Sequence, residues 1–499
     1  MKHWCFFKNL FNLCLALFLT FCLSSCQLLT SQYHSNSLHQ QQSIQYFTPE
    51  DLKQDEQFLL SSLSNVGIDP WKTLSQAQFE SELANIEKNT FWLQSRLDFY
   101  RRLAPLVASL KETHTRLIYP QSLRKQDGQN KPHFPLQLRL EDDHVYIEQD
   151  FSNKRLIPSG AEIYSINHVD IQQILTSMMK FIAAETITGA KRQAEFSFAT
   201  LLSTELGFQE PYLIDWSLGY LHTQTTLPTT QHLYATNTSP IKASANLEVR
   251  MINSETRLLK IHHFETKADL FDQQLDNFFE ELNQQQVNNL ILDLRYNGGG
   301  IGDNVLHLLS HLEAEPIHWA KNIQLKNSDT FRHYNAKRLK QLKKQKFGKP
   351  LSWLPIEYLN GWNWQLLFAD NGDLITQHID PEPLAREETQ FSGKILVLTN
   401  GYCFSGCAFF VNEIQTRHRG LLIGEQPGSL GGIQYGYPIT VTLPNTHLQL
   451  MIPVAKIIQA DKSHQIMPDI PIKTSAVGLA QGIDSYLSAA LKYLSMQSL

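Results

Sequence analysis

The chain has 499 residues, of which 42% are hydrophobic, and its formal net charge is -5 at pH 7. This length is sufficient for more than one hydrophobic core. The mildly negative charge excludes the strongly basic surface typical of nucleic-acid binding. We therefore expect a globular protein of several domains that has no nucleic-acid partner.

Residues 1–25 have the composition of a signal peptide. Two lysines precede an apolar run from Leu13 to Leu23, which is too short to span a bilayer. The run leads into Leu-Ser-Ser-Cys, which resembles the bacterial lipoprotein signal, so Cys26 would carry the lipid. Because Gln27 follows in place of aspartate, the resemblance implies an outer-membrane lipoprotein facing the periplasm of a bacterial cell envelope. An ordinary cleaved signal with an incidental cysteine is the alternative.

A tether and a helical region are predicted next. Residues 26–47 are polar and rich in Gln, Ser and His, as in a flexible linker. Within residues 48–125, apolar side chains recur at helical spacing, which predicts an N-terminal helical region. The helices end near His114. A single histidine in a loop is usually only solvated or hydrogen-bonded, so His114 becomes a candidate only through further observations.

Residues 126–244 are predicted to form a small β-rich module with a helical extension. Short alternating strands are punctuated by Pro and Gly, and a helical stretch follows from Ile174 to Leu206. The segment from Gly160 to Val169 resembles the end of a PDZ domain, although His168 replaces the usual glycine. A PDZ domain binds an extended peptide by strand addition.

Residues 245–499 are predicted to form the largest domain, beginning with a strand from Leu258 to Phe264 at an edge of its sheet. A second apolar strand starts at Asn289 and ends in three consecutive glycines, Gly298 to Gly300. Such glycines allow a backbone to approach another group closely and to direct its N–H groups into a concavity. Taken alone, the glycine run is more typical of a flexible turn than of an anion site.

A third apolar strand, starting at Ile395, leads into Ser405 and then a helix. At a helix N-terminus, free backbone N–H groups and the positive end of the dipole can stabilise an oxyanion. Serine is also a favoured N-cap, so simple capping is the alternative. Cys403 and Cys407 flank Ser405, and their spacing leaves open a disulfide, two buried thiols or a reactive pair.

Together these segments resemble the tail-specific, or C-terminal processing, protease family, whose relatives include the tricorn core protease and retinoid-binding repeats. The resemblance covers roughly residues 245–499 and rests on five motifs in a fixed order. The motifs are Asp293–Gly299, Ile395–Ala408, Leu422–Gly432, Pro468–Ile470 and Gly482–Leu494. The resemblance implies an α/β fold with a ClpP/crotonase-like core, a protein or peptide substrate, and no metal or organic cofactor.

The resemblance also implies that Ser405 is the nucleophile. The best-known branch of the family pairs this serine with a lysine, but Leu430 occupies the matching position and no lysine lies between Ser405 and Lys456. Another branch uses a histidine within an Asp-Gly-His-Thr or Ser-His element, which His114 matches, with Glu112 and a threonine in place of Asp-Gly. We therefore expect His114 to act as the general base.

Two further parts of the site follow from the same resemblance. The tricorn-like branch has a glutamate shortly before Pro-Asp-Ile, and Asp461 is the nearest carboxylate here, although Thr113 could also support the ring. The oxyanion hole would combine the Gly406 N–H with an N–H of the turn at Gly298 and Gly299. Three residues are assigned to support this turn: Asp293, Arg295 and Asn297.

An insertion over residues 322–388 separates the two strands and contains a basic run followed by three tryptophans. It is interpreted as a packed lid or, alternatively, as a surface for anionic lipid or polysaccharide. The predicted function is an envelope serine endopeptidase that cleaves extended or C-terminal protein segments. A non-catalytic ligand- or peptide-binding lipoprotein and an acyl hydrolase are the alternatives, because neither the fold nor a Ser-His site dictates amide cleavage.

Overall fold

The computed structural model describes most of the chain after residue 44. The described residues are 45–88, 92–119, 134–228, 246–313, 315–337, 365–366, 368–381, 390–460 and 465–497. The chain divides into two units, Met1–Tyr46 and Phe47–Leu499, and every structural feature described below except Tyr46 of β1 lies in the second. The signal peptide, Cys26 and Asp461 lie outside the described residues and stay predictions. Among the described helices, none has the length and apolar composition needed to cross a bilayer.

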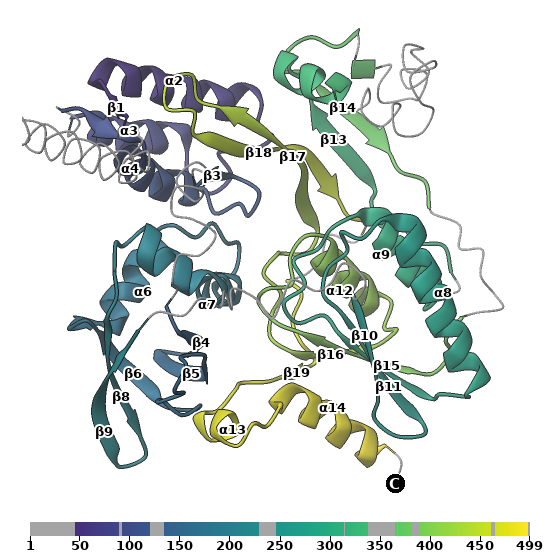
Figure 1. The fold of residues 1–499 in the computed structure, drawn as a ribbon. Coiled ribbons are helices and arrows are strands. Elements are labelled where there is room, and N and C mark those ends of the chain that lie inside the picture. The colour runs from purple at the N-terminus through teal and green to yellow at the C-terminus, as the bar shows by residue number, and fades with distance from the viewer. Residues whose placement is uncertain are drawn as a thin grey trace, which may run out of the picture. The chain divides into compact units, whose positions relative to one another are not determined.

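The described residues form a mixed α/β structure with several sheets (Figure 1). One sheet has six strands in the order β10-β11-β12-β15-β16-β19. Their bounds are Leu247–Met251 (β10), Thr256–Ile261 (β11), Asn289–Asp293 (β12), Lys394–Thr399 (β15), Leu421–Gly424 (β16) and Ile470–Pro471 (β19). β10 and β11 are antiparallel, and every later pair in the sheet is parallel.

The predicted edge position of the strand from Leu258 to Phe264 is wrong. This segment contains most of β11, which lies between β10 and β12, so β10 takes the edge. β10 is not recognisable as part of an apolar pattern because most of its residues are exposed and two of them, Glu248 and Arg250, are charged. β11 is almost entirely buried, as expected for an inner strand with both faces covered.

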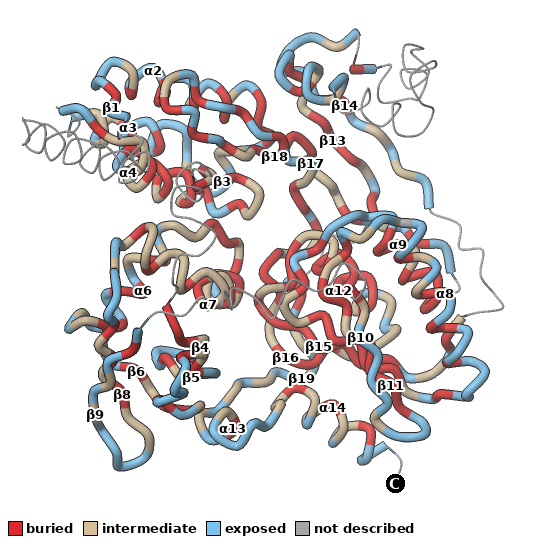
Figure 2. Tube along the Cα trace, viewed as in Figure 1, coloured by how far each residue is buried: buried red, intermediate tan, exposed pale blue. Residues whose placement is uncertain are grey.

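Alternate residues of β12 face two different cores, as the period of a strand requires. Leu290 and Leu292 lie in a core with α8, α9 and α12, whereas Ile291 packs in a second core with α14. These helices are Ala268–Gln284 (α8), Gly302–Ser310 (α9), Gly406–Thr416 (α12) and Ser485–Met496 (α14). Because both faces are covered, β12 and β15 are almost continuously apolar and buried. β15 is labelled among the buried segments in Figure 2.

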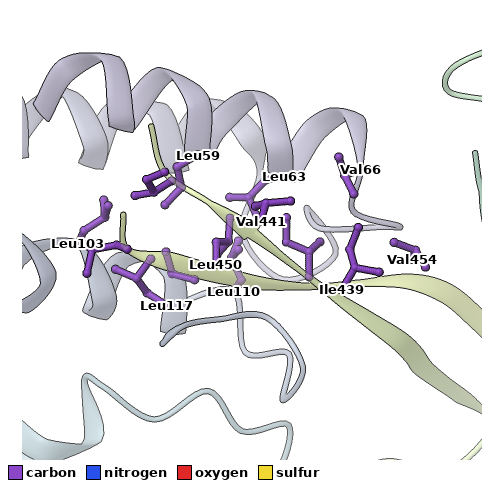
Figure 3. Packing of buried hydrophobic residues seen from close by; sticks show 14 of the residues in the cluster. Leu59, Leu63, Val66, Leu103, Leu110, Leu117, Ile439, Val441, Leu450 and Val454 are labelled. Carbon is purple, nitrogen blue, oxygen red and sulfur yellow. The ribbon is translucent and has the colours of Figure 1, made fainter. Parts of the chain in front are cut away.

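The N-terminal helices pack on a long β-hairpin of the same compact unit. They are Pro49–Asn65 (α2), Gln76–Lys88 (α3) and Arg96–Ala108 (α4), and the hairpin strands are Ile433–Thr442 (β17) and Gln449–Ile458 (β18). Capping boxes begin α2 at Thr48 and α4 at Ser95. Figure 3 shows the shared core, in which Leu59 and Leu63 of α2 pack with Val441 and Leu450 of the hairpin.

This packing fixes the segment that contains His114. Leu110 and Leu117, on either side of it, are 1% and 5% exposed and belong to the same core (Figure 3). The short strand Arg116–Ile118 (β3) also pairs antiparallel with β18. The histidine segment is therefore attached to the hairpin at both ends.

The module after the N-terminal helices has its own core and its own sheet, with β4-β5-β6-β8-β9 in order and β7 beside β6. Its strands are Leu136–Glu141 (β4), His144–Asp150 (β5), Glu162–Ile166 (β6), Val169–Asp170 (β7), Tyr212–Leu218 (β8) and Leu221–Leu227 (β9). The single helical stretch predicted from Ile174 to Leu206 is instead two helices, Ile171–Met179 (α6) and Ile187–Thr204 (α7). Thr186 caps the second helix by accepting from the Gly189 N–H at 3.0 Å, which ends the continuity of the stretch.

The described part of the 322–388 insertion extends the hairpin sheet. Asn322–Lys326 (β13) pairs with β18 and with Leu374–His378 (β14), giving the order β14-β13-β18-β17. Most of the basic run and the three tryptophans lie outside the described residues. The remaining short elements are Tyr46–Phe47 (β1), Gln94–Ser95 (β2) and Ala476–Ala480 (α13).

Candidate active site

The loops after β12 and β15 carry the candidate site. The two strands are parallel neighbours, with Asp293 opposite Leu398. The carboxyl ends of parallel neighbours meet at the same edge of a sheet, so the turns that follow them come together. This confirms the expected convergence of the glycine turn with the segment around Ser405.

Ser405 has a strained backbone, and its hydroxyl has no hydrogen-bond partner among the described residues. Its φ is 51° and its ψ is -121°, a conformation that is uncommon for any residue other than glycine. Although Ser405 occupies the N-cap position of α12, its side chain makes no capping hydrogen bond. The capping interpretation is therefore wrong. A strained strand-to-helix turn that leaves a serine hydroxyl available is typical of nucleophilic serines.

Gly299 lies directly against the Ser405 turn. A Cβ atom added to it would be 2.6 Å from the Phe404 carbonyl oxygen, 2.8 Å from the Gly406 nitrogen and 2.9 Å from the Ser405 Cβ. Its φ of +92° is also in the range that favours glycine. Only glycine fits here, because the two turns touch through their backbones.

Two backbone donors remain available beside Ser405. The Gly299 N–H donates to the Asn297 Oδ1 at 2.8 Å, so this donor is committed. No acceptor among the described residues takes the N–H of Gly298 or of Gly406. Gly406 is the first residue of α12, where the helix dipole favours negative charge. These two N–H groups are therefore not used by hydrogen bonds within the described part of the chain.

The glycine turn is held by the residues predicted to support it. Asp293 accepts from the Arg295 Nε at 2.8 Å, and Arg295 also forms two bonds of 2.8 Å with Asp484. Asn297 is fully buried and donates to the Ile261 carbonyl oxygen at 3.0 Å. Burial opposes the charge of Asp484, but the bonds and charge of Arg295 outweigh it and lower the pKa of Asp484.

Asn400 joins the two turns, and the sequence analysis missed it. Its Oδ1 accepts from the Tyr296 N–H at 3.0 Å and from the Tyr402 N–H at 3.1 Å. One amide oxygen therefore sets the spacing between the glycine turn and the Ser405 turn. The only sequence signal was an asparagine directly after an apolar strand.

His114 is held by Glu112. Its Nδ1 lies 3.1 Å from the Glu112 Oε1, which also accepts the His114 backbone N–H at 3.0 Å. The other carboxylate oxygen accepts from the Thr115 hydroxyl at 2.6 Å. With Nδ1 donating to a carboxylate, Nε2 is left with a lone pair, as a general base requires.

The Glu112 carboxylate is only 5% exposed, and burial alone would favour its neutral form. The hydrogen bond and charge of His114, together with the bond from Thr115, outweigh burial and lower the pKa of Glu112. Glu112 therefore contacts the ring where Asp461 was expected. The buried Thr113 hydroxyl has no partner among the described residues, so it does not support the ring in this structure.

Glu185 links the His114 segment to the Ser405 turn. Burial raises the pKa of Glu185. The charge of Glu112 raises this pKa as well, whereas the charges of Lys72 and His114 oppose the rise. Its Oε2 accepts from the Leu430 N–H at 3.0 Å. The adjacent Ser429 hydroxyl accepts from the Ser405 N–H at 3.2 Å. Glu185 therefore contacts the segment next to Ser429 and interacts electrostatically with the histidine segment.

Leu430 and two lysines, Lys456 and Lys72, have the following partners. Leu430 contributes only its backbone N–H to the site, through Glu185. Lys456, the first lysine after Ser405, bonds to Asp69 at 2.5 Å. Lys72 contacts this network, with its Nζ 3.7 Å from the Glu185 Oε1.

Cys403 and Cys407 form a disulfide with a Cα–Cα distance of 5.3 Å. Of the three states left open by their spacing, the structure therefore has the bridge. Both residues are fully buried, in the core that α12 shares with α8 and α9. The bridge closes a short loop around Ser405 and limits the motion of its turn.

A comparison with protein families now identifies the domain that contains this geometry. The model of peptidase family S41 matches residues 256–472. Residues 256–472 are a peptidase family S41 domain. The S41 domain includes the glycine turn and Ser405 but excludes His114. The predicted resemblance to tail-specific proteases is thereby confirmed, and the chain is a serine-type peptidase, a hydrolase.

The two CPAF structures below share the fold of this chain over most of its length. Mature CPAF complexed with lactacystin has a TM-score of 0.62 at 15% identity, covering 90% of this chain and 98% of the other. Mature CPAF alone has a TM-score of 0.60 at 16% identity, covering 88% and 96%. The photosystem II D1 C-terminal processing protease has a TM-score of 0.42 at 13% identity, covering 88% and 98%. No curated protein sequence matches this chain.

The contact between Glu112 and His114 gives a first prediction. In Glu112→Gln, the amide can donate to Nδ1 and favour the wrong tautomer, so kcat should fall by about 10²–10⁴-fold with KM nearly unchanged. The pKa of Glu112 is lowered on folding, so its contribution to stability is present above the unfolded pKa and is lost as pH falls through the folded pKa. The variant should therefore unfold more easily than the parent at pH 7, and this difference should shrink as the pH falls through the lowered pKa of Glu112.

Thr115→Val is the matched control, because it removes the other bond to Glu112 and leaves the ring contact in place. It should lower the unfolding temperature but keep most of kcat. Kinetics and thermal unfolding between pH 3 and pH 8 check both expectations. If Glu112→Gln and Thr115→Val lose kcat equally, Glu112 does not position the histidine.

Proposed function

We propose that this S41 protein is a serine endopeptidase of the bacterial cell envelope that cleaves extended or C-terminal protein segments. Ser405 would be the nucleophile and His114 the general base. The observation that carries the proposal is the strained Ser405 turn, which lies against Gly299 and whose hydroxyl has no partner among the described residues. The N–H groups of Gly298 and Gly406 likewise have no described acceptor. A serine used only for capping would have neither feature.

The proposed reaction follows the residues around Ser405. Its Oγ attacks the scissile carbonyl carbon while the His114 Nε2 accepts the hydroxyl proton. The charge that develops on the carbonyl oxygen is stabilised by the Gly298 and Gly406 N–H groups. His114 then gives its proton to the leaving amine, and water hydrolyses the acyl-enzyme with the same base. Glu112 keeps the Nδ1 proton in place throughout.

The assignment of Glu112 changes the role expected for Asp461. The Nδ1 of His114 already has a carboxylate partner, so a second one is not required to orient the ring. Asp461 lies outside the described residues and remains a predicted supporting group. The contact between the Glu112 carboxylate and the His114 ring is local in the sequence, because the two residues are two positions apart.

The preference for extended chains is supported by the module that contains β4 to β9. It carries the PDZ-like segment, from Gly160 to Val169, in β6 and β7. The strand β9 is largely exposed, and β8 is its one neighbour among the described strands. An extended polypeptide can add to such a strand through main-chain hydrogen bonds. We therefore include a PDZ-like docking role for this module, within a ClpP/crotonase-like architecture.

The envelope location rests on the N-terminal sequence. A lipid on Cys26 would hold the chain at the outer membrane, facing the periplasm, because several acyl chains anchor a protein stably. The disulfide beside Ser405 suits an oxidising compartment. Membrane fractionation tests this part: Cys26→Ala should move the chain to the soluble fraction, and retention of the variant in the membrane would refute the anchor.

The activity is tested with a panel of casein, peptides carrying C-terminal tags, and short-chain esters, each compared with Ser405→Ala. We expect cleavage of casein and the tagged peptides, with loss of cleavage in the variant. Ester hydrolysis without peptide cleavage would favour an acyl hydrolase. Binding of peptides without turnover of any substrate would favour a non-catalytic binding lipoprotein.

A further inference from the structure

We propose that Asp276, His307 and His311 form a site for a divalent first-row transition metal such as zinc. The site lies between α8 and α9, apart from the Ser405 turn, and it does not depend on the proposed mechanism. Two imidazoles and one carboxylate are a ligand set that suits zinc and its neighbours, while magnesium and calcium favour oxygen ligands alone.

The spacing of the residues directs them to one place. His307 lies in the last turn of α9 and His311 is its C-cap residue, four positions later. Asp272 and Asp276 are also four apart, on α8. Residues with this spacing project from the same face of a helix. α8 and α9 lie side by side in Figure 1, and their apolar residues share one core.

The distances agree with a metal site. The Nε2 of His307 and the Nε2 of His311 each lie 3.0 Å from the Asp276 Oδ1. One ligand atom from each of the three residues falls within 4.8 Å of the others. Ligands held about 2.0–2.1 Å from a tetrahedral zinc are roughly 3.3 Å apart. A small adjustment of the side chains would therefore admit the ion.

The surroundings of both rings resemble the outer shell of a metal centre. The other nitrogen of His307, Nδ1, lies 3.2 Å from the Asp272 Oδ1. Histidine ligands commonly donate this second N–H to a carboxylate, which fixes the tautomer and directs the free nitrogen to the metal. The His311 ring is fully buried and stacks on Phe279 with centroids 4.3 Å apart. Both rings are thus held in place before an ion arrives.

Simple ion pairing between the helices is the alternative explanation. His307 has a carboxylate oxygen beside each ring nitrogen, so donation to both requires two ring protons. A metal at Nε2 takes the place of one of them, and Nδ1 still donates to Asp272. The Asp276 side chain is 43% exposed, which gives an ion a path from solvent and leaves room for a water ligand.

Metal binding would join α8 to the helix that follows the glycine turn. α9 begins at Gly302, directly after Gly300. Asn304 on the first turn of α9 already donates to the Phe264 and Thr266 carbonyl oxygens, at 3.0 and 2.8 Å. The ion would fix the opposite end of α9, so its role would be to stabilise this part of the S41 domain and not to take part in peptide hydrolysis.

The test uses the purified, untagged, metal-stripped chain titrated with Co²⁺ and with Zn²⁺. We expect one Co²⁺ site with the visible absorption of tetrahedral cobalt, displacement of cobalt by zinc, and an unfolding temperature that rises with zinc concentration. Asp276→Asn and His307→Gln should weaken binding at least 100-fold. Asp272→Asn, which alters the outer shell alone, should weaken it by about 10–100-fold.

His318→Ala is the matched control, because this histidine belongs to the same domain but is exposed and outside the cluster. It should bind as the parent does. Asp276 is partly exposed, so its asparagine variant should keep its fold, which circular dichroism checks. Absence of a specific cobalt spectrum in the folded parent, or a folded Asp276→Asn variant that binds with parental affinity, would overturn the proposal.

Discussion

Replacing His114 with alanine should abolish the reaction of Ser405 with a fluorophosphonate probe and lower peptide hydrolysis by about 10⁴-fold or more. The reason is that the Ser405 hydroxyl needs a base to remove its proton, and we propose His114 as that base. The buried Glu112 carboxylate contacts the His114 Nδ1 and leaves Nε2 to accept the proton. The measurement is covalent labelling followed by peptide mapping. This labelling reports whether the Ser405 hydroxyl is activated, and it does not require a known substrate.

His447→Ala is the control for this experiment, since it removes an exposed histidine near the same hairpin and should leave labelling unchanged. Labelling that survives His114→Ala would contradict the assignment of the base. Lys72 would then be the first lysine to test, because its Nζ lies 3.7 Å from Glu185. If Ser405 in the folded parent never reacts, a binding function becomes the better hypothesis, and ligand screening should replace substrate screening.

The second large effect is expected for Gly299→Ala. The added methyl group would meet three atoms of the Ser405 turn at 2.6–2.9 Å, two of which are backbone atoms that cannot move independently. The turns must separate, which displaces the oxyanion donors. Loss of a single such donor costs about 10²–10³-fold in kcat, and disturbance of both should cost more. Steady-state kinetics and thermal unfolding of the purified variant measure the effect.

Gly372 provides a matched control for the cost of backbone strain. Its φ of +94° is close to that of Gly299, but a Cβ added there would have no neighbour within 4 Å. Gly372→Ala should therefore lose about 1 kcal/mol or more of stability from strain while keeping its activity. If Gly299→Ala resembles this control, the close contact of the two turns is not important for catalysis.

The parts of the site that the sequence predicted are those determined by local patterns. β12 and β15 are recognisable because strands covered on both faces are continuously apolar. Ser405 and the glycine turn follow directly from the ends of these strands. β10, by contrast, is an edge strand with exposed charged residues, so its sequence lacks that pattern.

The partners of the site residues were harder to predict because they depend on tertiary contacts. Asp484 reaches Arg295 from a distant part of the chain, and Glu185 becomes a neighbour of the site only because α6 and α7 are separate helices. Glu112 was noted only as a departure from the family pattern. Its role was visible only once the backbone showed its carboxylate turned toward the ring two residues later.

The attachment of the His114 segment to the β17–β18 hairpin determines when the active site is assembled during folding. The nucleophile lies within the S41 domain, but the proposed base lies before it, on a segment fixed by the core of the N-terminal helices. A chain in which the S41 domain has folded but these helices have not docked carries a serine without a base. The chain would thus become proteolytically active only once folding is complete. A chain that is incompletely folded or truncated would not cleave other proteins.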